Sequence, residues 1–369
     1  MKSTTIRRWS QVHTWSSLIC TLFLLMLALT GLPLIFHHEI DQLLGDAPVL
    51  RERPADTPAL DLQALVAAAE AHRPGEVVQY LGWEDDEPNA VMAITAARAD
   101  TEPNASHTFL LDARSGEALE MPSANGGPML FILRLHVDLF AGLPGKLLLA
   151  GMGILFIVAL VSGTLLYAPF MRRLGFASVR HARAARTRWL DRHNLIGIVT
   201  LTWALVVGIT GVFSACADLL IAAWRNDTLA AMVAPYRDLP PPRERAPVTR
   251  LAALAGAAAP GTRPDFIAFP GTRFSSAHHY TVFMKGATPL TSHLWTPVLI
   301  DAQSLAVTAV GGRPWYMDVL AMSQPLHFGD YGGMPMKVLW ALLDGLTLVV
   351  LGSGLYLWWA RRRASPAPR

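Results

Sequence analysis

Charged side chains are scarce in this chain of 369 residues. Asp, Glu, Lys and Arg together make up 16% of the sequence, whereas hydrophobic residues make up 52%. A soluble protein has about 25% charged residues. The composition therefore excludes a wholly water-soluble fold and predicts that part of the surface contacts the apolar interior of a lipid bilayer.

Cysteine is also rare, and no glycine-rich nucleotide-binding motif occurs. Cys20 and Cys216 both lie in apolar runs, so we interpret them as small hydrophobic residues rather than as a disulfide or a metal-binding pair. Without a nucleotide-binding motif, the chain is not expected to contain a flavin or NAD domain of its own. No nucleic-acid partner is predicted either.

Four apolar runs are long enough to cross a bilayer, whose core of roughly 30 Å needs about 20 helical residues. They cover 16–36, 146–170, 195–224 and 336–360. A signal peptide is the alternative for the first run, because Arg7 and Arg8 precede it. That run ends in Ile-Phe-His-His-Glu rather than in a small-residue cleavage site, so we predict that it stays in the protein.

Basic residues gather in three segments, and they predict the orientation. They lie near the N-terminus, between the second and third runs, and at the C-terminus (Lys2, Arg7, Arg8, Arg172, Arg173, Arg180, Arg183, Arg186, Arg188, Arg192, Arg361, Arg362 and Arg363). Loops rich in Arg and Lys stay in the cytoplasm. We therefore predict a multi-pass protein of the bacterial inner membrane with both termini in the cytoplasm and two large periplasmic segments.

The two halves of the chain resemble each other. Residues that recur 180 positions later are Arg8, Trp9, His13, Thr30 and Gly31, and those that recur 191 positions later are Leu135, His136, Gly142, Pro144, Lys146, Ser162 and Gly163. Each half contains two apolar runs, so both halves have the same orientation. This pattern predicts two parallel repeats related by a pseudo-two-fold axis along the membrane normal.

The large segments also resemble each other, since each has an Ala/Leu-rich stretch (60–71 and 251–258) followed by strand-like runs (91–95 and 281–284). The predicted fold is an α-helical membrane protein, a four-helix transmembrane bundle with two small α+β extramembrane modules. The predicted parts are 1–38 with the first span, 39–134 as the first module, 135–172 with the second span, 173–192 as a basic loop, 193–224 as the third span, 225–325 as the second module, and 326–369 with the fourth span.

Four of the twelve histidines belong to the repeat. His13 and His193 open the first and third spans at the cytoplasmic face, whereas His136 and His327 precede the second and fourth spans at the periplasmic face. The pseudo-two-fold axis brings each pair face to face. Two opposed imidazoles are the axial ligands of a six-coordinate haem, so we predict two haems b, one near each face. At about 1.5 Å per helical residue, the repeated glycines are expected at the same depths in the membrane as the histidine pairs.

Other interpretations of these residues stay open. Membrane-edge histidines can anchor a helix at the interface, and a divalent metal site would need carboxylates such as Asp138 and Asp330. His37 and His38 are alternative ligands of the outer haem. Candidate propionate contacts are Arg8 and Arg188 for the inner haem and Lys146 and Lys337 for the outer one, with snorkelling as the alternative. We interpret His278 and His279 as surface residues.

Several motifs resemble the PepSY-associated transmembrane helix family over nearly the whole chain. They are Trp9 with His13, Thr30 with Gly31, the Asp-Arg-His-Asn motif at 191–194, and the Pro-Leu-His-Phe-Gly motif at 325–329. The resemblance implies that the two modules are PepSY domains, although Ser304-Leu305 departs from the glycine found at Gly116. It further implies a ferric-siderophore reductase of the ferrioxamine type, with haem ligands at His13, His136, His193 and His327.

The expected activity is therefore that of an oxidoreductase. A cytoplasmic reductase or a membrane quinol would supply electrons, and an Fe(III)-siderophore in the periplasm would receive them. Two other functions remain as alternatives. One is a PepSY binding or regulatory module without redox activity, and the other is a siderophore permease.

Overall fold

The chain folds into two compact units. One consists of Met1–His37, Phe131–Asp218 and Ser323–Arg369, and the other of His38–Leu130 and Leu219–Met322. The computed structural model describes residues 3–46, 48–51, 54, 57–83, 87, 89–121, 125–171, 178–288, 291–329 and 331–364. Lys2, Arg172, Arg173 and Asp330, which entered the predictions above, lie outside the described residues.

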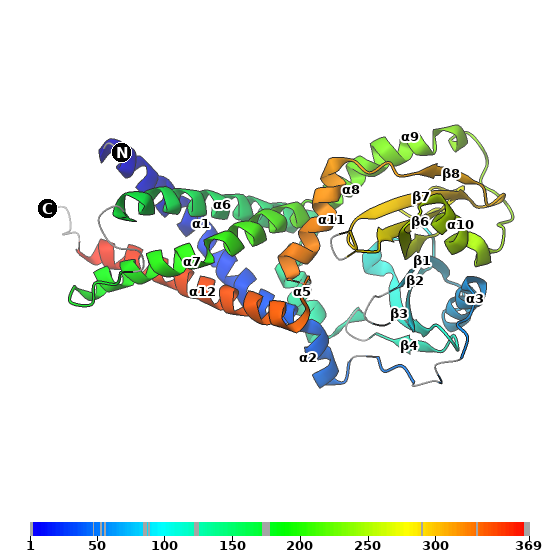
Figure 1. The fold of residues 1–369 in the computed structure, drawn as a ribbon, viewed down its shortest axis with the longest axis horizontal. Helices are drawn as coiled ribbons and strands as arrows, with labels where there is room; N and C mark the ends of the chain where they lie inside the picture. The colour runs from blue at the N-terminus through cyan, green and yellow to red at the C-terminus, as the bar shows by residue number, and fades with distance from the viewer. Residues whose placement is uncertain are drawn as a thin grey trace. The chain divides into compact units, whose positions relative to one another are not determined.

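The first unit is built on four long helices. They are α1 (Ser3–Ile35), α6 (Leu143–Met171), α7 (Ala185–Ala215) and α12 (Gly333–Ala364). All four are long and apolar enough to cross a membrane, which confirms the predicted membrane protein with four spans. Helices α1 and α7 each contact both α6 and α12, so the four helices close into a bundle with α1 and α7 on one diagonal. Figure 1 shows the start of α1, the end of α6, the start of α7 and the end of α12 at the same end of this bundle.

The third apolar run does not form one helix. Helix α7 ends at Ala215, and after a break at Cys216 the chain continues as α8 (Ala217–Trp224). The predicted span over 195–224 was therefore too long. Helix α1 ends in the same way at Ile35 and is followed by α2 (His37–Leu44).

A short helix precedes each of the other two spans. Helix α5 (Gly127–Asp138) comes before α6, and α11 (Trp315–Phe328) comes before α12. Helix α11 ends because Gly329 has a positive φ of 82°, and its N–H bonds to the carbonyl of Pro325, as in many helix ends. His136 and His327 thus lie in the last turns of two short helices.

The second unit contains one antiparallel sheet of eight strands in the order β4-β3-β2-β1-β5-β6-β7-β8. The strands are β1 (Val77–Trp83), β2 (Ala90–Ala96), β3 (His107–Asp112), β4 (Ala118–Glu120), β5 (Thr262–Ala268), β6 (His279–Gly286), β7 (Trp295–Asp301) and β8 (Val307–Val310). Strand β1 pairs with β5, with Leu81 opposite Ile267. The two separate modules expected from the sequence are therefore joined in a single sheet.

Two helices cover this sheet. Helix α3 (Leu62–His72) packs on β1 to β4, and α10 (Leu251–Ala258) packs on β5 to β8, over one continuous apolar core. The remaining helical segments are short: η1 (Pro103–Ala105), η2 (Arg225–Leu229), α9 (Ala230–Met232), η3 (Ala234–Tyr236) and η4 (Val248–Arg250). The turn after β7 has Leu305 at a φ of 58°, where the turn after β3 has Gly116 at 72°. The departure noted in the sequence is therefore a leucine in a left-handed conformation.

His279 is fully buried in β6, so its interpretation as a surface residue was wrong. Its Nδ1 lies 2.7 Å from the Oγ of Ser276, and its ring packs edge-on against Tyr236 at 4.4 Å. Its Nε2 is buried without a hydrogen-bond partner among the described residues. Burial lowers the pKa of His279 to about 4, because the charged imidazolium would lose its hydration there.

This buried histidine predicts a pH-dependent stability. The pKa is depressed in the folded state, so the unfolded chain binds the extra proton first, and stability is lost as the pH falls from 6.5 towards 4. The expected loss between pH 7 and pH 5 is about 2 kcal/mol. Thermal melting at the two pH values should show a loss that is larger by this amount in the wild type and in the neighbouring variant His278→Gln than in His279→Gln. An equal pH dependence in all three proteins would contradict it.

Candidate functional site

The inner histidine pair joins the two diagonal helices of the bundle. His13 on α1 and His193 on α7 have ring centroids 6.4 Å apart, with 71° between the ring planes. Each imidazole packs against a glycine of a different helix. A Cβ atom built on Gly163 of α6 would lie 3.0 Å from Cε1 of His13, and one on Gly354 of α12 would lie 3.5 Å from Cε1 of His193. The glycines therefore provide the space that the imidazoles occupy.

The Nδ1 atoms of the inner pair bond to the helices that carry these glycines. Nδ1 of His13 donates to the carbonyl of Ala159 at 2.9 Å, with the hydroxyl of Ser162 at 3.4 Å. Nδ1 of His193 lies 2.9 Å from the hydroxyl of Ser353 and 3.2 Å from the carbonyl of Val350. Since a carbonyl only accepts, the proton of each neutral imidazole is on Nδ1 and the lone pair is on Nε2.

The outer pair has the same construction. His136 on α5 and His327 on α11 have ring centroids 6.4 Å apart, with 66° between the planes. Cε1 of His136 lies 3.5 Å from the Cβ position of Gly31, and Cε1 of His327 lies 3.0 Å from that of Gly211. Both imidazoles are therefore backed by glycines of the diagonal helices α1 and α7.

Two threonine hydroxyls orient the outer pair. Oγ1 of Thr30 lies 2.8 Å from Nδ1 of His136, and Oγ1 of Thr210 lies 3.2 Å from Nδ1 of His327. Each hydroxyl donates to the backbone of its own helix, so it is free to accept from the imidazole. Nδ1 of His327 also donates to the carbonyl of Val207 at 3.0 Å. The outer imidazoles thus also keep a lone pair on Nε2.

The spacing of both pairs fits an iron between the rings. An imidazole centroid lies about 1.1 Å from Nε2, and a metal–imidazole bond is about 2 Å long. Two imidazoles on opposite faces of one haem iron therefore have centroids roughly 6.3 Å apart. Both pairs have 6.4 Å. Among the described residues, no hydrogen bond reaches Nε2 of any of the four histidines, as a metal ligand requires.

The predicted propionate contacts have different surroundings. Nζ of Lys146 donates to the carboxylate of Asp218 at 2.6 Å. The guanidinium of Arg188 donates to the carbonyl of Arg183 at 3.1 Å. Arg8 is exposed, and Lys337 is half-buried in the first turn of α12. Lys146 therefore already has an anionic neighbour within the bundle unit.

The alternative ligands lie elsewhere. His37 and His38 are exposed at the start of α2, and Nδ1 of His37 bonds to the carbonyl of Leu34 at 2.9 Å. Asp138 accepts from the N–H of Phe140 at 2.9 Å, and so it ends α5. Within the described part of the chain, no three His, Cys, Asp or Glu side chains group as metal ligands. This arrangement does not favour a divalent metal site at the outer pair.

Sequence reasoning missed two features of this region. It used Thr30, Ser162 and their repeats only as markers of the duplication, although their hydroxyls contact the Nδ1 atoms. Their place directly before each glycine was the available signal. It also passed over Asp344 on α12, which is buried with Oδ2 unbonded among the described residues. That oxygen lies 4.0 Å from the Cβ position of Gly31. An acid inside an apolar run was the signal for it.

The segments that carry the four histidines are similar to known proteins. The family model described as the PepSY-associated TM region matches residues 10–361, which include all four histidines. The chain is also 30% identical over 268 residues to the uncharacterized protein PA4219 of Pseudomonas aeruginosa. That match covers 64% of this chain and 65% of the relative, so the chain spans slightly less than two thirds of the relative's length. The chain belongs to the PepSY-associated transmembrane family.

Proposed function

We propose that this protein is a haem-dependent ferric-siderophore reductase of the bacterial inner membrane. The observation that carries the proposal is the pair of matched histidine sites, His13 with His193 and His136 with His327. Each has the ring spacing expected of two axial ligands, and in each the Nδ1 atoms are bonded while Nε2 has no hydrogen bond from the described residues. A helix anchor needs no such pairing, and ionisable residues placed inside a bundle are functional by default.

The positions of the elements support two parallel repeats. Helices α1 and α7 end 180 positions apart, and so do α2 and α8. The series α3-β1-β2-β3-β4 and α10-β5-β6-β7-β8 have the same order. We interpret them as two PepSY-like modules that share a sheet. The basic bundle end belongs in the cytoplasm, and the modules then belong in the periplasm.

Haem b, when bound at the two pairs, supplies one-electron transfer along the bundle. The chain's residues would hold it and keep water away from it. The hydroxyls of Ser162, Ser353, Thr30 and Thr210 orient the imidazoles, and the apolar helices form the surrounding wall. In this proposal Arg8 and Arg188 would hold the inner propionates, and Lys146, which is also bonded to Asp218, and Lys337 would hold the outer ones.

The overall reaction transfers one electron for each iron. A cytoplasmic reductase or a membrane quinol is oxidised, and Fe(III) in the periplasmic siderophore is reduced to Fe(II). A quinol releases two electrons and two protons and so reduces two ferric chelates. Fe(II) has a lower charge than Fe(III), binds the oxygen donors of the siderophore more weakly, and is released for uptake.

The proposal predicts a red protein with two haems b for each chain. A visible spectrum of the purified protein should show b-type bands that sharpen with dithionite, and the reduced protein should be reoxidised by a ferric siderophore in a stoichiometry of two irons per chain. A gallium siderophore, which accepts no electron, is the matched control. A colourless protein from haem-replete cells would overturn the proposal and favour a PepSY binding module.

A further inference from the structure

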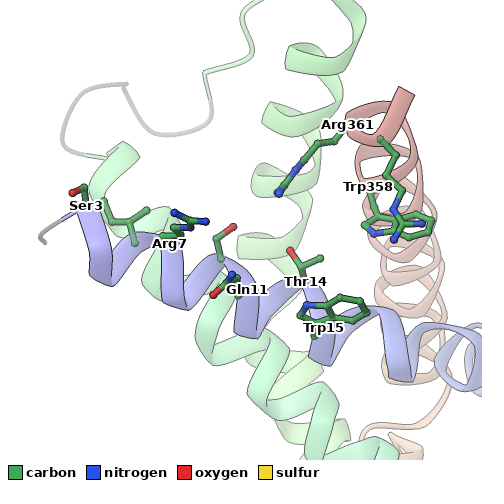
Figure 2. Close-up of a pocket in the computed structure, with 10 residues that line it drawn as sticks. Ser3, Arg7, Gln11, Thr14, Trp15, Trp358 and Arg361 are labelled. Carbon is green, nitrogen blue, oxygen red and sulfur yellow. The ribbon is translucent and has the colours of Figure 1, made fainter. Parts of the chain in front are cut away.

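A groove lies at the bundle end that holds both chain termini. The first turns of α1 and the last turns of α12 form it, as Figure 2 shows. Its volume is about 540 Å³. Sites for small ligands have volumes of about 300–1,000 Å³. The groove is therefore large enough for a ligand headgroup, and one of its lining residues, Thr14, directly follows His13 in α1.

Three arginines give this groove an uncompensated positive charge. Arg7 comes from α1, and Arg361 and Arg362 come from α12. Among the described residues, no carboxylate forms an ion pair with any of them. The sequence explains this, because 1–38 and 345–369 contain no Asp or Glu. Residues 172–192 contain a single acid, Asp191 of α7, whose carboxylate already accepts two bonds of 3.0 and 2.7 Å from Arg180.

The rest of the lining changes from polar to aromatic along α1. Ser3, Ser10 and Gln11 offer hydroxyl and amide groups, and Trp15 lies further along the helix. From Ser3 to Trp15 the helix rises about 18 Å, at roughly 1.5 Å per residue. On the opposite wall, the guanidinium of Arg362 lies 4.2 Å over the ring of Trp358. The groove therefore suits an elongated ligand with an anionic head and an apolar body.

We propose that this groove binds the phosphate headgroup of an anionic phospholipid. A quinol head is neutral and leaves three guanidinium groups unmatched, whereas a phosphate diester accepts their hydrogen bonds. A soluble phosphate compound shares the charge but has no apolar body to cover the exposed ring of Trp15. Basic pockets between spans on the cytoplasmic side bind anionic headgroups of this kind. The leaflet follows from the orientation proposed above.

The bound lipid would connect the two halves of the inner histidine site. Helix α1 carries His13, and α12 carries Gly354, which packs against His193. A headgroup held by Arg7 and Arg361 bridges these two helices. Lipid binding itself requires no haem, so the proposal is tested on the full chain with or without haem, separately from the reductase activity.

Native mass spectrometry of the delipidated chain tests the proposal. The probes are short-chain phosphatidylglycerol, short-chain phosphatidylcholine, inorganic phosphate and flavin mononucleotide. Each removed arginine is expected to weaken phosphatidylglycerol binding about fivefold. The variants are Arg7→Gln, Arg361→Gln and the double variant, for which the expected loss is about 25-fold. Arg363→Gln is the matched control, because Arg363 lies outside the groove over the ring of Trp359.

The expected result is preference for phosphatidylglycerol over phosphatidylcholine, loss of that preference in the double variant, and an unchanged affinity in Arg363→Gln. Equal binding of the two lipids would overturn the proposal, and so would an equal loss in the control. Competition by inorganic phosphate or flavin mononucleotide at the lipid's own affinity would also overturn it, in favour of a soluble phosphate ligand. Unchanged melting temperatures of the variants establish that the fold is intact.

Discussion

The variant His327→Ala is expected to contain one haem per chain instead of two. In the proposed arrangement His327 would supply one axial ligand at the outer pair, and the inner pair consists of His13 and His193. His13→Ala should remove the inner haem in the same way. Each variant should lose at least about a hundredfold in ferric-siderophore reduction, because the effect of a lost ligand exceeds the 10–100-fold effect of its hydrogen-bond partners. Pyridine haemochrome analysis gives the haem content directly.

Two controls separate loss of a ligand from loss of the fold. His181→Ala changes an exposed histidine of the α6–α7 connection and should keep both haems. In His327→Gly, added imidazole should restore the second haem, since the free base fills the space of the missing ring. If His38→Ala or His37→Ala removed the outer haem while His327→Ala retained it, the outer pair assigned here would be wrong.

The number of spans was predictable from the sequence, but their ends were not. Runs of about 20 apolar residues identify helices that cross a bilayer. They do not reveal that α1 already begins at Ser3, because polar residues continue a helix into water without an apolar signal. They also do not reveal the break at Cys216, where no Pro or Gly marks the end of α7.

The joined sheet was not predictable from the strand patterns. Alternation of apolar residues shows which face of a strand is buried, but not which other strand lies beside it. The β1–β5 pairing, with Tyr80 opposite Ala268, connects residues about 190 positions apart and depends on the packing of both halves. The burial of His279 follows from the same packing, since a single polar residue in a strand carries no sign of what covers it.

The repeat was the informative feature of the candidate site. Register alone paired His13 with His193 and His136 with His327, and the structure brings both pairs to the same ring separation. Register could not assign the hydroxyl groups a role, because hydrogen bonding depends on side-chain direction. It also could not predict Asp344, whose counterpart 191 positions earlier is Gly153, so this acid belongs to one half only.

The variant Gly211→Val is expected to lose the outer haem although all four histidines are intact. A Cβ at this position would lie 3.0 Å from Cε1 and 3.5 Å from Nδ1 of His327, and the two methyl groups of valine extend beyond it. The imidazole must then move, and its bonds to Thr210 and Val207 break. A shift larger than the few tenths of an ångström that a metal–ligand bond tolerates removes the ligand.

Gly197→Val is the matched control for this variant, because it makes the same change in the same helix where nothing lies within 4 Å of the Cβ position. Both variants contain the same effect of valine on helix α7 itself, but only Gly211→Val contacts His327. Gly197→Val should therefore retain both haems. The same pair of experiments applies to the inner site with Gly163→Val and Gly151→Val on α6. Substitution by alanine should lower the haem content less at Gly31 and Gly354 than at Gly163 and Gly211. The Cβ position lies 3.5 Å from the imidazole in the first two and 3.0 Å in the other two. Equal haem content in Gly211→Val and Gly197→Val would show that close contact with His327 is irrelevant to cofactor binding.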